Sequence, residues 1–179
     1  MKKILAFVLA TTMVFSMIAC GNNEEVATET TETVATETVE VVPGTANGTV
    51  GEQILESVGT ALSGLEEASV EDIVALASAP VENYVSLVSM PVEEGYLNGF
   101  DNVEIKGFEE GVMFAPMVGT IPFVGYVFSL PADADVDAFV TTLTDSANPR
   151  WNICTSADET VVEAYGNKVL FVMCPASFE

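Results

Sequence analysis

The chain has no histidine, and it contains a single arginine and a single tryptophan. Histidine is the commonest general base near neutral pH and a frequent metal ligand, so its absence excludes histidine-containing triads and dyads and histidine-ligated metal sites. The chemistry that remains for an enzyme would have to use carboxylates or lysine. We therefore expect no cofactor, and we expect the protein not to be an enzyme.

Basic residues are also scarce, with 5 Lys and Arg against 27 Asp and Glu and a net charge of -22 at pH 7. Lys2 and Lys3 stand at the N-terminus, which leaves Lys106, Arg150 and Lys168 for the rest of the chain. Nucleic acid and anionic lipid headgroups repel a chain with this much negative charge. On charge grounds, neither is therefore an expected partner. Cations and basic proteins remain open as partners.

The N-terminal segment has the pattern of a secretory signal. Lys2 and Lys3 precede an uncharged run from Ile4 to Ala19, which falls just short of the roughly 17 to 25 residues of a spanning helix. Met17-Ile18-Ala19-Cys20 resembles the bacterial lipobox. The resemblance implies cleavage after residue 19 and a diacylglyceryl group on Cys20, with palmitate-type acylation. The alternatives are an uncleaved anchor or an ordinary secreted protein.

A lipidated Cys20 predicts the location of the protein. Two or three acyl chains anchor a protein stably, so the expected place is the outer face of the bacterial cytoplasmic membrane, or another envelope membrane. Residues 21–49 contain a near repeat, VATETTET then VATETVEV, with six glutamates and no aromatic residue. This composition predicts a disordered tether with a reach of roughly 30 Å. An edge strand is the alternative for its valines.

Residues 50–179 are predicted to form a single domain. Apolar residues at helical spacing predict helices, and runs rich in Val, Ile and Phe predict strands. The expected helices are Gly51–Glu66, Val70–Ala79 with an extension to about Ser89, and Asp135–Ala147; the expected strands are Val103–Ile105, Val112–Met117, Pro122–Ser129, Thr160–Tyr165 and Lys168–Cys174. Gly166-Asn167 is a two-residue hairpin signal between the last two strands.

One uncharged stretch, Gly111–Leu130, is long enough to be weighed as a transmembrane helix. Two prolines and three glycines within it favour two buried strands joined around Gly119-Thr120 instead. The order of elements then predicts an α+β fold in two layers, with helices packed on one face of a mainly antiparallel sheet.

The lipobox, the helix pair, the central strands, Asn148-Pro149-Arg150 and the closing hairpin around Gly166-Asn167 together resemble small uncharacterised bacterial lipoproteins that carry a domain of unknown function. The resemblance covers about residues 80 to 175. It implies the same fold class. It brings no catalytic or binding residue, because no activity is established for that group.

Three aspartates form the only pattern with a metal-like spacing. Asp133, Asp135 and Asp137 match the first half of a calcium loop, but Ala138 and Thr144 stand where an EF-hand needs Gly and Glu. Capping of the following helix explains the same residues without a metal. A cation-dependent structural or adhesive module stays open as an alternative function.

Cys154 and Cys174 are the two thiols left after Cys20, and an even count in an exported domain allows a disulfide between them. Their apolar neighbours equally suit free buried cysteines. Arg150-Trp151 has two interpretations as well. It is either an exposed contact for a partner, or a structural pair in which Arg150 satisfies carbonyls at the helix end and Trp151 packs in the core.

Paired acids such as Glu93-Glu94, Glu109-Glu110 and Asp158-Glu159 are expected to be solvated turns and not a catalytic pair. The sequence therefore predicts a membrane-anchored extracytoplasmic binding or interaction domain whose protein or small ligand it does not name. An accessory subunit of an envelope complex is a further alternative, and it predicts a contiguous exposed apolar patch.

Overall fold

The computed structural model describes residues 48–63 and 68–178. All of them belong to one compact unit, Glu40–Glu179, and only that unit is discussed below. The predicted signal peptide (residues 1–19), Cys20 and residues 21–47 of the predicted tether lie outside the described residues.

The described residues begin with two helices, continue with five strands, and end with a third helix and two strands. In order they form α1 (Val50–Leu62), α2 (Val70–Ser78), a short 3-10 turn (Ala79–Val81), β1 (Leu87–Pro91), β2 (Gly95–Tyr96), β3 (Glu104–Ile105), β4 (Glu110–Pro116), β5 (Val124–Ser129), α3 (Val136–Ser146), β6 (Glu159–Tyr165) and β7 (Lys168–Cys174). None of these helices is long and apolar enough to cross a membrane. The Gly111–Leu130 stretch forms β4 and β5, as the prolines and glycines predicted.

Side-chain caps fix where α1 and α2 begin. Thr49 and Glu52 form a capping box at the start of α1, and Ser69 and Asp72 form a second one at the start of α2. In each box the hydroxyl accepts from the N3 backbone N–H while the acid accepts from the N-cap N–H. Asp72 accepts hydrogen bonds from the backbone N–H and the hydroxyl of Ser69, and these lower the pKa of its carboxyl.

Five strands form the main sheet, in the order β1-β4-β5-β7-β6 with every neighbouring pair antiparallel. β2 and β3 form a separate two-stranded sheet. Alternate residues of a strand point to opposite faces. Along β7, Leu170, Val172 and Cys174 therefore face one core cluster, while Val169, Phe171 and Met173 face the other.

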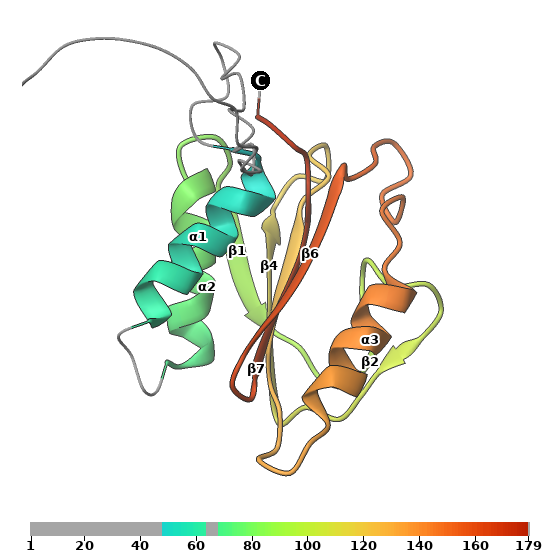
Figure 1. The fold of residues 1–179 in the computed structure, drawn as a ribbon. Coiled ribbons are helices and arrows are strands. Elements are labelled where there is room, and N and C mark those ends of the chain that lie inside the picture. Colours follow the sequence, from blue (N-terminus) through green and yellow to red (C-terminus); the bar gives the residue numbers. More distant parts are fainter. Residues whose placement is uncertain (1–47, 64–67, 179) are drawn as a thin grey trace, which may run out of the picture. The chain divides into compact units, whose positions relative to one another are not determined.

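The fold class α+β with a mainly antiparallel sheet is confirmed, and the structure adds a layer to it. Helices α1 and α2 cover one face of the sheet, whereas Phe139 and Leu143 of α3 pack on the opposite face, with β3 and the segment around Phe100 (Figure 1). The prediction had placed all helices on one face. Both faces of β5 and β7 are apolar, so each face needs its own cover.

The predicted helical extension to about Ser89 is wrong. The chain turns after Val81, and β1 begins at Leu87 and pairs along its whole length with β4, from Leu87↔Pro116 to Pro91↔Val112. The apolar spacing in this segment fitted a helix, but a short apolar run is ambiguous between helix and strand. The backbone hydrogen bonds that β4 offers decide the outcome, and they come from residues more than twenty positions away.

Candidate functional site

The acidic residues at turns bond mostly to the backbone. Glu94 Oε1 accepts from Gly107 N at 2.6 Å, Glu159 Oε2 accepts from Gly51 N at 2.9 Å, and Asp158 Oδ2 accepts from Ala176 N at 3.1 Å. Each carboxylate satisfies a backbone donor that would otherwise depend on water. These acids hold loops and helix ends in place, and the adjacent pairs do not face each other across a cleft.

The three candidate aspartates lie at the start of α3. Asp135 Oδ1 accepts from Ala138 N at 3.0 Å and so caps the helix, which is the role that the capping interpretation predicted. Asp133 and Asp137 are exposed. Within residues 48–63 and 68–178 no three Asp, Glu or Cys side chains gather closely enough to hold a metal ion.

The two cysteines of the domain are free, with Cys154 exposed and Cys174 buried. Cys174 belongs to the core cluster beneath α1 and α2, while Cys154 follows Trp151, which packs against the cluster on the other face of the sheet. The two thiols thus lie in different environments, and the alternative of a buried free cysteine holds for Cys174 alone. Burial first, and then the nearby Glu159 carboxylate, raise the pKa of Cys174 to about 12.

Arg150 and Trp151 play different parts. Trp151 is half-buried and packs against the core beneath α3, in line with the structural interpretation. Arg150 is exposed, and no hydrogen bond links its guanidinium to a carbonyl of α3 within the described chain. Its own backbone N–H donates to Asn148 Oδ1 at 2.9 Å. The expected role of Arg150 at the helix end is not seen, and its charge faces solvent.

Next to Trp151 lies a surface that is unusual for so acidic a chain. Met117 and Val118 of the β4–β5 loop are 81% and 66% exposed, and Ile153 of the α3–β6 loop is 99% exposed. Asn152 Nδ2 donates to Gly119 O at 2.6 Å and ties the two loops together. Behind them is a groove of about 520 Å³ lined by Met113, Ala115, Trp151 and other uncharged residues. We call these three tips and the groove the apolar loop surface.

The stretches of sequence that carry these three tips contain no carboxylates. No Asp or Glu occurs from residue 111 to 132 or from residue 146 to 157, although the chain carries 27 acidic residues. Arg150 is the one charged residue in these two stretches. Exposed apolar side chains that cluster, as opposed to single ones, mark contact sites for proteins or membranes. The apolar loop surface is thus the candidate functional site.

Sequence reasoning placed Met117 at a strand end and Ile153 in an apolar setting, and it missed the surface that they share. A signal was present. This acidic chain contains two stretches of 22 and 12 residues without Asp or Glu, and each has apolar residues in a segment that connects two predicted elements. Such stretches indicate segments whose solubility does not depend on charge. What the sequence could not provide is the contact between Asn152 and Gly119, which joins them.

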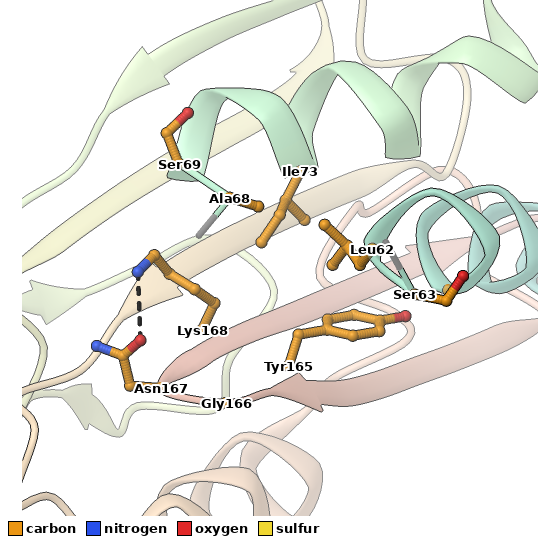
Figure 2. Close-up of a pocket in the computed structure, with 10 residues that line it drawn as sticks. Leu62, Ser63, Ala68, Ser69, Ile73, Tyr165, Gly166, Asn167 and Lys168 are labelled. Atoms are coloured by element: carbon orange, nitrogen blue, oxygen red, sulfur yellow. Dashed lines mark hydrogen bonds between the residues drawn. The ribbon is translucent and has the colours of Figure 1, made fainter. Parts of the chain in front are cut away.

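A second hollow lies at the other end of the sheet, between the end of α1, the start of α2 and the β6–β7 turn (Figure 2). Its volume is about 950 Å³, and Leu62, Ile73 and the ring of Tyr165 form its apolar part. Lys168 Nζ donates to Asn167 Oδ1 at 3.2 Å on its rim. The rim also includes Ser63 and Ala68, which flank residues 64–67 outside the described chain, so one wall of this hollow is not defined.

No protein-family model, no curated protein and no solved structure matches this chain. The site therefore has to be interpreted from its own geometry. The resemblance to small bacterial lipoproteins, which rests on the lipobox and the order of elements, stays a prediction.

Proposed function

We propose that this protein is a lipid-anchored, extracytoplasmic interaction domain that acts by surface contact and not by catalysis. In this proposal Cys20 is the acylated N-terminus, residues 21–49 are a spacer, and the domain of residues 50–179 carries the contact surface. The lipobox-like Met17 to Cys20 supports the anchor. The predicted place is the outer face of the bacterial cytoplasmic membrane or another envelope membrane.

The apolar loop surface is the observation that carries the proposal. Met117, Val118 and Ile153 expose large apolar side chains to water from stretches without Asp or Glu, which is costly unless something covers them. A ligand-binding or protein-binding role needs such a surface, whereas an enzyme needs converging polar groups around a reacting atom. Several carboxylates of the described domain, among them those of Glu94, Asp158 and Glu159, instead bond to backbone N–H groups.

The surface equally favours a second candidate function, an accessory subunit of an envelope complex. That function predicts a contiguous exposed apolar patch, and the hydrogen bond from Asn152 to Gly119 supports it by tying together the loops that carry the exposed residues. The two candidates differ in what covers Met117, Val118 and Ile153. If the protein is an accessory subunit, one defined protein of the complex covers these three side chains.

Two measurements test the proposal. The mass of the mature N-terminus should show a diacylglyceryl group on Cys20, and Cys20→Ser should move the chain from the membrane fraction to the soluble fraction. A photo-cross-linking amino acid in place of Ile153 should then give an adduct in intact cells. The same amino acid at Thr141, an exposed position on α3, is the matched control. Equal labelling from both positions, or none from either, would count against a contact role for this surface.

A further inference from the structure

We infer that the apolar loop surface rests on the bilayer to which the chain is anchored, so that the domain sits on the membrane in one orientation. This inference rests on the proposed lipid anchor and names the partner of the same surface. The occupant is the lipid interface, and the side chains of Met117, Val118 and Ile153 insert into it.

The position of the tether is the first argument. The first residue of α1 donates from Val50 N to Ala176 O at 3.0 Å, and Gly51 N donates to the carboxylate of Glu159, where β6 begins. β6 begins opposite the end of β7, because Glu159 pairs with Cys174. The chain that precedes Thr49 therefore joins the domain at this end of the sheet.

The apolar loops lie at the same end. β5 begins at Val124, which pairs with Met173 next to the end of β7, so the β4–β5 loop with Met117 and Val118 projects from there. The α3–β6 loop with Ile153 leads directly into Glu159. Figure 1 shows the start of α1, the β4–β5 loop and the start of β6 together, near the top of the view. An anchor on the tether thus brings these loops close to the bilayer.

Charge is the second argument. A negatively charged chain is repelled by anionic headgroups, but the repulsion between exposed charges fades beyond about 8 Å at physiological salt. The acid-free loops form the face that can come nearest to such a membrane, and Arg150 beside them can pair with lipid phosphates. Three acids at this end of the domain, Glu52, Asp158 and Glu159, already accept from backbone N–H groups.

Because the chain is anchored, even a weak contact between the apolar loop surface and the bilayer is enough to orient the domain. The tether that the sequence predicts, with an expected reach of roughly 30 Å, would hold the domain at a high effective concentration beside the membrane. Three exposed apolar tips then need only a modest affinity for the interface to stay engaged. A second copy of the chain is a less suitable occupant, because two domains of this charge repel each other wherever they meet outside the loops.

Trp151 provides the test, because it is the only tryptophan of the chain and lines the groove beside Ile153. The full acylated chain is reconstituted in vesicles of phosphatidylethanolamine and phosphatidylglycerol, with or without brominated phosphatidylcholine. We expect the brominated lipid to quench Trp151 and the emission maximum to lie at a shorter wavelength than in the Cys20→Ser chain, which stays free in solution. Ile153→Ser should weaken the quenching, and Met117→Ser/Val118→Ser/Ile153→Ser should remove most of it.

The matched control is Tyr96→Ser, which removes another strongly exposed apolar side chain, on β2. It should leave the quenching unchanged. An acylated chain whose Trp151 is not quenched would overturn the bilayer contact, and a cross-link from position 153 to a protein or to a second copy would then identify the occupant. An unacylated Cys20 would overturn the proposed function and this inference together, so the two failures are distinguishable.

Discussion

Gly125, in the middle of β5, is the position where the structure makes its sharpest stability prediction. Phe114 of β4 pairs with it, and the ring of Phe114 lies directly over its backbone. A Cβ added at Gly125 would stand 2.1 Å from Cζ of that ring and 2.5 Å from both Cε atoms. Ordinary contact begins at 3.4 Å, so Gly125→Ala forces the ring to move by about 1.3 Å.

A displaced ring would lose part of its packing. Phe114 is fully buried and packs against Phe123, with ring centroids 5.9 Å apart, beneath α2. Overpacking of this kind costs about 1–3 kcal/mol of folding free energy. For a domain of this size, about 3–5 °C of melting temperature is lost per kcal/mol. We therefore expect Gly125→Ala to lower the melting temperature, measured by circular dichroism, by at least several degrees.

Gly59 in α1 is the matched control, because a Cβ there meets no atom within 4 Å. Gly59→Ala should stabilise the helix by about 0.5–1 kcal/mol, since alanine loses less backbone entropy. In a Phe114→Leu background, which removes the far end of the ring, Gly125→Ala should cost less than in the natural chain. An unchanged or raised melting temperature for Gly125→Ala alone would refute the reasoning.

Three further predictions follow from single contacts. Asp135→Ala should lower the free energy of unfolding by about 1 kcal/mol, measured by chemical denaturation, because it removes the cap on Ala138 N. Millimolar calcium should not raise the melting temperature of the natural chain. A thiol reagent at pH 8 should label Cys154 in the folded chain and Cys174 only after unfolding, which mass spectrometry would detect; rapid labelling of both would contradict the burial. Burial raises the pKa of Cys174 from 9.0 to about 12 and the pKa of Tyr165 from 10.0 to about 12. The unfolded state therefore loses these two protons at lower pH than the folded state does, and the free energy of unfolding should fall between about pH 9 and pH 12. The fall should be less steep in Cys174→Ala.

Local signals in the sequence predicted much of the fold. The periodicity from Val136 to Leu143 with acids before it gave α3 to within a residue at each end, and β7 was predicted with its observed bounds. Both are decided within one segment, by apolar spacing, a cap and a two-residue turn. β1 was mistaken for a helix because its identity depends on β4, its only partner in the sheet.

The candidate site, too, depends partly on local sequence and partly on contacts between distant residues. The acid-free stretches can be counted in the sequence, and so can the single Arg150 within them. That Met117, Val118 and Ile153 meet on one surface depends on a contact over 33 positions of the chain, from Asn152 to Gly119. No local rule predicts such a contact, because it forms only when the sheet brings two loops to one end.

By itself the sequence determined the α+β class, most helix and strand segments, the acidic character of the chain and the cap at Asp135, because each follows from neighbouring residues. Only the tertiary structure decided that α3 covers the face opposite α1 and α2, that Cys174 is buried while Cys154 is exposed, and that the apolar loops share an end with the start of α1. The physical reason is that strand order and the assignment of faces depend on pairing between distant segments, which the pattern within any one segment leaves open.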